Sequence, residues 1–142
     1  MPTVRDILHQ QELYSVSQNQ TVADAARRMA ELHVGAILVL EGGALRGVFS
    51  ERDLMTRVVV ERRDPAGTLV ADVMTCNVAT VEDSATPEQA MESMRIRNCR
   101  HLPVLRGPQV VGFLSMRDLM NFELERKTEE LQHMRAYIHG SA

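Results

Sequence analysis

The sequence contains few aromatic residues and no tryptophan. Phe, Trp and Tyr together make up 4% of the 142 residues. Proteins that bind single-stranded nucleic acid stack the bases on aromatic side chains, so stacking platforms of this kind are not expected here. The formal net charge of -3 also argues against a general DNA or RNA binder, which is normally basic. We therefore expect no nucleic-acid partner.

Long apolar runs and cysteines are also scarce. The longest apolar run, Val34 to Leu40, contains a glycine and is much shorter than a membrane span. Asp6 stands where a signal peptide would have its apolar region. Cys76 and Cys99 form no close pair, so neither a disulfide framework nor a metal site is expected. These absences favour a cytoplasmic protein with free thiols, with no membrane segment and no metal.

What the sequence does contain is one stretch that occurs twice. Gly47–Met55 reads Gly-Val-Phe-Ser-Glu-Arg-Asp-Leu-Met, and Gly112–Met120 reads Gly-Phe-Leu-Ser-Met-Arg-Asp-Leu-Met. Each copy begins like the end of a buried strand, and its Ser-x-x-Asp is the capping box that opens a helix. A helix start with free N–H donors, a serine, an arginine and an aspartate can hold a phosphate and a sugar. The alternative is that the serine and aspartate only cap the helix and the arginine is only solvated.

The duplication extends beyond this motif. Aligned without a gap, positions 21–55 and 86–120 share 12 of 35 residues, whereas chance would give about two. The period is too long for a solenoid array. We therefore predict an α+β (α/β) fold in which two β-α-β-β-α repeats pack face to face as a pseudo-two-fold pair, with an extended C-terminal helix. Residues 1–66 form repeat 1 with an N-terminal helix, residues 67–122 form repeat 2, and residues 123–142 form a helical tail.

Capping residues, turn residues and apolar periodicity place the individual elements. In repeat 1 they predict helices after Thr3, after Thr21 and from Ser50 to about Arg62, and strands over 13–16, 36–40 and 45–49. In repeat 2 they predict helices over 69–74 and after Thr86, and strands over 78–81, 101–105 and 110–114. The inward face of the helix after Thr86 is expected to carry Ala90, Met91 and Met94. The last helix is expected to continue to His139 with an apolar stripe, which a second copy of the chain would cover.

The two repeats, each with Gly-h-h-Ser-x-Arg-Asp-Leu-Met (h, apolar), and the strand Arg100–Val104 closely resemble a tandem pair of CBS domains, also called a Bateman module. The resemblance covers nearly all of Val4–Met120. It implies a non-catalytic regulatory module that binds adenosine-containing ligands in clefts between the repeats: AMP, ADP, ATP, NAD(H) or S-adenosylmethionine. It also implies a homodimer that reports energy or redox state to a regulated protein in trans.

The resemblance assigns roles to individual residues. Asp53 and Asp118 resemble the acids that accept hydrogen bonds from ribose hydroxyls, a task that suits an acceptor-only carboxylate. The residues that match positions near phosphate are Ser50, Ser115, Arg52, Arg117, Arg100 and His101. The residues that would wall or touch the adenine are Ile37, Leu38, Leu102, Pro103, Ser15 and Thr80.

The two clefts are not expected to be equivalent. Repeat 1 has Gly35 and Ala36 at the places of Arg100 and His101. The cleft that contains the basic pair should therefore prefer the more highly charged ligand. AMP and NAD(H) rank first, because the cations of one cleft suit one or two phosphates better than three, and ATP, ADP and S-adenosylmethionine follow. Taken without the resemblance, His101 also fits a histidine that is satisfied within the core.

Two other functions are compatible with the residues. An enzyme acting on the nucleotide would need a base beside a nucleophile, or acids that hold Mg²⁺, whereas the motif offers one carboxylate per cleft. A structural dimerisation module with weak or no ligand binding would need the caps, but a cap alone would accept other residues in place of both aspartates. We therefore expect a regulatory module and not an enzyme.

Overall fold

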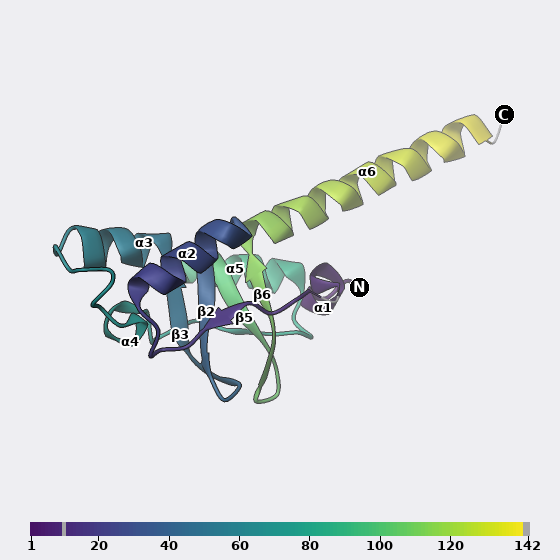
Figure 1. The fold of residues 1–142 in the computed structure, drawn as a ribbon. Coiled ribbons are helices and arrows are strands. Elements are labelled where there is room, and N and C mark those ends of the chain that lie inside the picture. Colours follow the sequence, from purple (N-terminus) through teal and green to yellow (C-terminus); the bar gives the residue numbers. More distant parts are fainter. Residues whose placement is uncertain (10, 141–142) are drawn as a thin grey trace.

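The computed structural model describes residues 1–9 and 11–140. Two halves lie side by side, and one long helix projects away from them (Figure 1). The first half of the sequence contains α1 (Val4–Leu8), β1 (Ser15–Val16), α2 (Val22–Leu32), β2 (Ala36–Glu41), β3 (Ala44–Ser50), α3 (Glu51–Asp53) and the π-helix η1 (Leu54–Val59). The second half contains α4 (Val70–Val73), β4 (Val81–Glu82), α5 (Pro87–Arg97), β5 (His101–Arg106), β6 (Gln109–Ser115) and α6 (Met116–Gly140).

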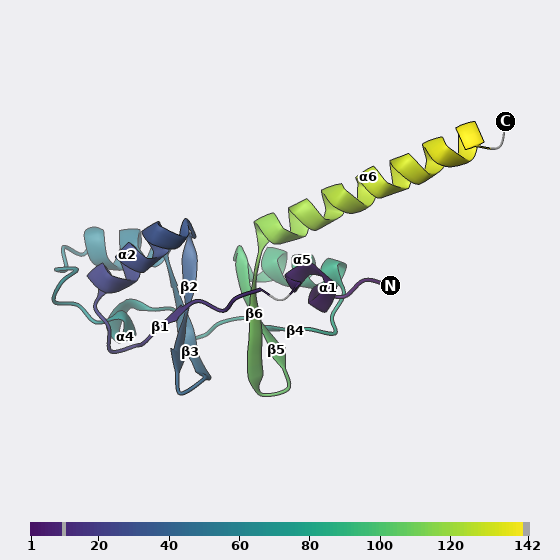
Figure 2. The ribbon, with the colours of Figure 1, turned by 45° about the vertical axis from the view of Figure 1, so that its right-hand side comes forward.

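Each half of the sequence supplies one three-stranded sheet. The strand order is β1-β2-β3 in the first sheet and β4-β5-β6 in the second. In both sheets the first pair of strands is parallel and the second pair is an antiparallel hairpin. The two hairpins lie next to each other and point the same way (Figure 2). The α+β fold with two β-α-β-β-α repeats that the sequence predicts is therefore confirmed.

Side-chain caps start the long helices of the two repeats where the sequence predicts them. Thr21 Oγ1 accepts a hydrogen bond from Asp24 N at 3.1 Å, which begins α2. Thr86 Oγ1 accepts one from Gln89 N at 3.1 Å, and Thr86 N donates to Gln89 Oε1 at 2.9 Å, which begins α5. Such caps satisfy backbone N–H groups that have no partner inside the helix. Both helices are 11 residues long, as expected for two copies of one duplicated unit.

Three buried clusters hold the molecule together. The first lies inside repeat 1 and includes Ile37 and Phe49, and the second lies inside repeat 2 and includes Leu102. The third contains Leu38 of β2 and Val110 of β6, so it joins the two sheets. Neighbouring residues of one strand belong to different clusters because successive side chains point to opposite faces of a sheet.

The two short helices are exchanged between the repeats. α1 places Val4 in the core of repeat 2, whereas α4 places Val70 in the core of repeat 1. Val4 N donates a hydrogen bond to Ala85 O at 2.8 Å, and Val70 N donates the matching bond to Gln20 O at 2.9 Å. The chain therefore crosses from one repeat to the other twice, once after each short helix.

The glycine that begins each repeated motif leaves room for these crossings. A β-carbon on Gly47 would lie 2.6 Å from the carbonyl oxygen of Thr75, and one on Gly112 would lie 2.5 Å from Leu8 Cδ1. Real β-carbon contacts are longer, because dispersion attraction between carbon atoms is optimal near 3.5–4.0 Å. Both glycines are thus explained by packing against segments that are distant in the sequence, which no local pattern indicates.

Four expected details are wrong. The strand expected over 13–16 is the shorter β1, Ser15–Val16. The strand expected over 78–81 is instead β4, Val81–Glu82. Met91 is 38% exposed, because it lies about 100° around the helix from Ala90, which points inward together with Met94. The helix that follows Ser50 does not remain an α-helix to Arg62, since it becomes a π-helix at Leu54 and ends at Val59.

The C-terminal helix continues past the module, as the sequence predicts. α6 is 25 residues long, and Leu119 is its buried residue. The first turns of α6 lie against α5, and the rest projects from the module (Figures 1 and 2). Residues 141–142 of the expected tail lie outside the described residues. No helix within the described ranges is both long enough and apolar enough to cross a membrane.

Candidate functional site

The repeated Ser-x-x-Asp motif forms a closed capping box in both repeats. Asp53 N donates to Ser50 Oγ at 3.1 Å, and Ser50 N donates to Asp53 Oδ2 at 3.0 Å. In repeat 2 the same two bonds join Ser115 and Asp118 at 3.0 and 2.8 Å. Both aspartates therefore use one carboxylate oxygen as a cap. Any contact with a ligand must therefore use the other carboxylate oxygen, Oδ1, of each aspartate.

The inner strands begin directly beside these helix starts. Ala36 is the register partner of Ser50, and His101 is the register partner of Ser115. Glu51 N donates to Gly35 O at 2.9 Å, and Met116 N donates to Arg100 O at 2.8 Å. The structure therefore brings together the expected site residues of each repeat: Gly35, Ala36, Ser50, Arg52 and Asp53 in repeat 1, and Arg100, His101, Ser115, Arg117 and Asp118 in repeat 2.

The two aspartates differ in how much of the carboxylate is still available. Asp53 is 6% exposed. Its Oδ1 accepts a hydrogen bond from Thr75 Oγ1 at 3.0 Å and lies 3.9 Å from Arg57 Nε. Asp118 is partly exposed, and its Oδ1 has no hydrogen-bond partner within the described part of the chain. The carboxylate of Asp118 is therefore the more available of the two.

Thr75 contacts the candidate site at Asp53, and reasoning from the sequence missed it. It lies beyond α4, and it pairs with Val48 through two backbone hydrogen bonds of 3.0 and 2.9 Å. That pairing carries its hydroxyl to Asp53 from 22 positions away. Its only signal in the sequence is its place after the short helix, because a lone threonine carries no motif.

His101 lies where the two repeats meet. Burial lowers the pKa of its imidazole, the carboxylates of Asp118 and Glu51 oppose this shift, and Arg100 adds to it. Glu51 belongs to repeat 1, so the start of α3 lies close enough to the β5 strand to influence the charge of His101. The imidazole ring also lies 5.3 Å from the ring of Phe113, centroid to centroid. His101 is thus a partly buried histidine near the carboxylates of two helix starts, and it does not lie wholly within the core.

Three arginines surround these helix starts without an acidic partner. Arg52, Arg100 and Arg117 are all exposed, and none forms an ion pair with another described residue. Other arginines are paired, for example Arg95 with Glu92 at 2.6 Å. Guanidinium groups that are held near two helix N-termini and lack a carboxylate partner favour an anionic ligand.

The apolar wall expected from the sequence has to be corrected. Ile37 and Leu102 are 1% and 0% exposed and belong to the separate cores of repeats 1 and 2. Side-chain alternation therefore turns them away from the space between the sheets. Leu38 belongs to the cluster that joins the sheets, and Pro103 lies on the His101 face of β5, opposite Phe113. Of the four expected wall residues, only these two lie on the strand faces that are turned toward the other repeat.

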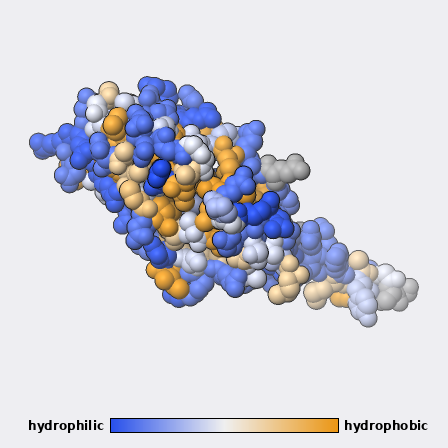
Figure 3. Space-filling view, turned by 90° about the horizontal axis from the view of Figure 1, so that it is seen from below, coloured by the Kyte–Doolittle hydropathy of each residue, from blue (hydrophilic) through white to orange (hydrophobic). Residues whose placement is uncertain are grey.

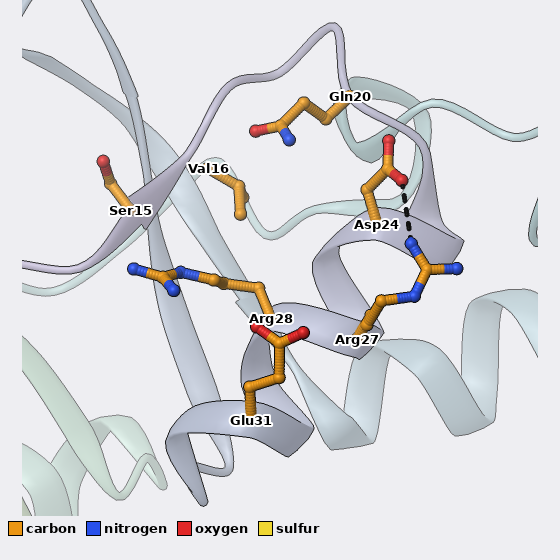
Figure 4. Close-up of a pocket in the computed structure, with 7 residues that line it drawn as sticks. All are labelled: Ser15, Val16, Gln20, Asp24, Arg27, Arg28 and Glu31. Carbon is orange, nitrogen blue, oxygen red and sulfur yellow. Dashed lines mark hydrogen bonds and ion pairs between the residues drawn. The ribbon is translucent and has the colours of Figure 1, made fainter.

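Ser15 and Thr80 do not join the groups described above. Thr80 is exposed and precedes β4. Ser15 lines a polar hollow between β1 and α2, shown in Figure 4, whose other lining residues are Val16, Gln20, Asp24, Arg27, Arg28 and Glu31. Arg27 is paired with Asp24 at 3.4 Å in this hollow. No other residue expected at the site lines it, so the hollow is separate from the two helix starts.

Comparison with known proteins places these features in a family. The model of the CBS domain matches residues 4–60 and 70–125. The chain is 34% identical over 127 residues to "CBS domain-containing protein CBSX3, mitochondrial" of Arabidopsis thaliana, covering 86% of this chain and 62% of that protein. It is 34% identical over 119 residues to CBS domain-containing protein YhcV of Bacillus subtilis, covering 84% of each. The chain thus spans less than two thirds of the first relative's length.

Solved structures agree with this result. A putative signal-transduction protein with CBS domains from Burkholderia ambifaria matches with a TM-score of 0.84 and 36% identity, over 87% of this chain and 95% of that one. The structure of CBSX2 in complex with AMP matches with a TM-score of 0.77 and 26% identity, over 89% of this chain and 99% of that one. The protein PAE2072 from Pyrobaculum aerophilum, complexed with AMP, matches with a TM-score of 0.75 and 27% identity, over 82% of this chain and 89% of that one. The chain belongs to the CBS-domain family and is a tandem CBS pair.

Proposed function

We propose that this chain is a non-catalytic regulatory module that binds an adenosine nucleotide between its CBS repeats. The observation that carries the proposal is the group around Asp118: a carboxylate with one oxygen still available, the imidazole of His101, and the unpaired guanidinium groups of Arg100 and Arg117. A carboxylate oxygen can accept from ribose hydroxyls, and the cations can bind phosphate. Relatives that contain AMP, CBSX2 and PAE2072, support the same ligand class.

The Asp118 group is proposed as the principal site. Asp53 has both carboxylate oxygens engaged, by Ser50 N and by Thr75 Oγ1. A ribose at that position would have to compete with the hydroxyl of Thr75. Repeat 1 also has Gly35 and Ala36 where repeat 2 has Arg100 and His101. AMP and NAD(H) are the preferred ligands, because the few cations of one group match one or two phosphates.

The occupied state of Asp53 favours a second candidate function. A capping box that is closed, buried and bonded to Thr75 is a complete structural device without any ligand. Were the Asp118 group also unable to bind nucleotides, the chain would be a structural dimerisation module. The regulated protein in trans, the homodimer and the cytoplasmic location stay predictions from the sequence, and the first relative carries "mitochondrial" in its name.

The test is a panel of melting temperatures. AMP, NAD⁺, NADH, ATP, S-adenosylmethionine, GMP, adenosine and 2′-deoxy-AMP are each added in excess to the full chain. At a hundredfold excess over the dissociation constant, one bound ligand adds about 2.7 kcal/mol, which raises the melting temperature by roughly 8 °C. We expect AMP and NAD(H) to give the largest shifts, and 2′-deoxy-AMP and adenosine much smaller ones. Equal shifts with all eight compounds, or none with any, would favour the structural module.

Matched variants assign the effect to the proposed residues. Asp118→Glu keeps an acid at the cap but displaces its carboxylate by one methylene, so the affinity for AMP should fall about tenfold to a hundredfold. Asp53→Glu should lower the melting temperature of the free protein more than the affinity, because Asp53 is buried and holds Thr75. Asp24→Glu at the cap of α2 is the control and should change neither. Unchanged AMP affinity in Asp118→Glu would remove Asp118 from the site.

A further inference from the structure

The part of α6 that projects from the module carries apolar side chains in solvent. Leu124, Leu131, Met134 and Ile138 are 64%, 54%, 60% and 63% exposed. Figure 3 shows apolar residues among the hydrophilic ones along this projecting helix. Leu124, Leu131 and Ile138 are spaced by seven residues, and Met134 falls at the intermediate position. A seven-residue apolar repeat on one helix is the pattern of a coiled-coil seam.

This seam is not the face by which α6 packs on its own module. The packed face contains the buried Leu119 and the partly buried Met116. It continues to Arg126, whose Nη1 lies 3.8 Å from Oε1 of Glu88 in α5. At about 100° per residue, Leu124 and Leu131 lie roughly a third of a turn or more around the helix from Leu119. The seam therefore offers a second face, which the described part of the module does not cover.

The charges beside the seam decide which partner fits it. Glu123 and Glu130 follow one edge, and Thr128 and Arg135 follow the other. In a parallel coiled coil, a residue on the first edge meets the residue five positions later on the second edge of the other helix. Glu130 of each copy would then meet Arg135 of the other copy. In an antiparallel pair the same edges meet, which would bring glutamates together.

Lys127 is the one charged residue on the seam between Leu124 and Leu131. Its ammonium lies 3.7 Å from Glu130 Oε2, so it already turns toward the edge of the helix. A single polar residue in a coiled-coil seam lowers stability but fixes the register. A lipid surface fits less well, because residues 123–139 contain four glutamates against three Arg and Lys residues, whereas membrane-surface helices are rich in cations.

We propose that residues 120–138 of α6 pair with the same segment of a second copy as a parallel, in-register coiled coil. The proposal goes beyond nucleotide binding and does not depend on it. It specifies the direction and the register of the pairing, which the prediction of a homodimer leaves open. It also places the two modules at the same end of the paired helices.

Site-specific disulfide formation tests the direction. In a full chain carrying Cys76→Ser and Cys99→Ser, the single variants Leu124→Cys and Met134→Cys are each oxidised and run on a denaturing gel. Both should form disulfide-linked dimers, because both positions face their own copies in a parallel pair. These positions are about 15 Å apart along the helix, so no single antiparallel register brings both to their own copies. Glu129→Cys, on the opposite face, is the control and should stay monomeric.

Two further variants test the energetics of the seam in the Leu124→Cys background. Leu131→Glu should reduce the yield of the linked dimer roughly tenfold or more, because it puts a charge in the seam. Lys127→Leu should raise the yield, which no misfolded variant would do. The melting shift with AMP should be the same in both, so that failure here is distinguishable from failure of the nucleotide site. The proposal is overturned if the two cysteine variants link only when mixed, if neither links, or if Glu129→Cys links equally well.

Discussion

His101 is the residue at which burial and charge oppose each other most clearly. Burial lowers the pKa of its imidazole, although Asp118 and Glu51 act in the other direction. In the free protein the folded-state pKa therefore lies below the unfolded value of about 6.5. The stability that depends on a neutral His101 is present above about pH 6.5, and it is lost as the pH falls from there toward the folded-state pKa.

A bound phosphate should reverse this shift, because an anion beside the ring favours the imidazolium. We predict that AMP binding takes up a proton at His101, so that affinity increases as the pH is lowered from 7.5 to 6.0. The increase is at most about tenfold per pH unit for one proton. Calorimetry in buffers of different ionisation enthalpy measures the proton uptake directly.

The phosphate of AMP itself titrates near pH 6, so the wild-type result needs a reference. His101→Gln retains the ligand's own titration and should lose only the uptake that belongs to the imidazole. His133→Gln, an exposed histidine of α6, should behave like the wild type. The same proton uptake in His101→Gln and in the wild type would place the phosphate away from His101.

At the scale of elements, α1 is held on repeat 2 by one buried carboxylate. Asp83 is 3% exposed, and its Oδ2 accepts from Arg5 Nε at 3.0 Å and from Arg106 Nε at 2.8 Å. The hydrogen bond from Arg5 is the main cause that lowers the pKa of Asp83, against the effect of burial. One carboxylate thus joins α1 to β5, beside the backbone bond from Arg5 N to Asp83 O.

We predict that Asp83→Asn lowers the free energy of unfolding by about 1.5–3 kcal/mol, the value of hydrogen bonds to a charged group. Urea unfolding at pH 7 measures it. Because the folded-state pKa of Asp83 is depressed, the difference from the wild type should vanish when the pH falls below that pKa and the wild-type carboxyl is protonated. Glu92→Gln removes an exposed pair with Arg95 and should change stability by less than about 1 kcal/mol. An equal effect of the two substitutions would contradict a structural role for Asp83.

Local signals in the sequence were sufficient for most elements. The helix capping boxes at Ser50, Ser115 and Thr86 form where Ser or Thr is followed three residues later by Asp or Gln. They can be predicted because a cap is made by residues that are close in sequence. The exchange of α1 and α4 could not be predicted, since it depends on which core each helix contacts. Nothing near Val4 encodes a bond to Ala85.

The orientation of single side chains was the weaker part of the site prediction. Ile37 and Leu102 are apolar neighbours of Ala36 and His101, so a family pattern includes them, but the pleat directs them to separate cores. Thr75 was missed because it is distant in sequence from Asp53. Its backbone pairing with Val48, where the chain crosses between the repeats, brings it there. The Asp motifs and the Arg100–His101 pair lie side by side because strand register and capping, both readable from the sequence, position them.

At the scale of the whole molecule, the two crossings tie the repeats together in unequal ways. Val48 and Thr75 exchange two backbone hydrogen bonds in repeat 1. At the matching place in repeat 2, Phe113 bonds instead with the side chain of Gln11, at 2.9 and 3.1 Å. A side-chain amide there reproduces a backbone pairing. The two halves are therefore similar in fold but different in chemistry next to each aspartate, which agrees with one principal nucleotide site.

The module also exposes apolar side chains away from the tail. Met55 and Val59 of η1 and Ile96 of α5 are 56%, 63% and 65% exposed. Burying such residues gives about 25 cal/mol for each Å² of apolar surface removed from water. A second copy is the simplest partner for these surfaces, because soluble oligomers are mostly symmetric pairs.

We predict a homodimer in which the modules and the tails both contribute. Light scattering on the full chain should give twice the chain mass at micromolar concentration. A chain that ends at Phe122 should still dimerise, but more weakly, because the module surfaces remain and the seam of α6 is removed. Val59→Glu in the truncated chain should then give a monomer, whereas Ala30→Glu, at an exposed position of α2, should not. A monomeric full chain would contradict the homodimer, and an unchanged dimer after truncation would leave the tail without a part in it.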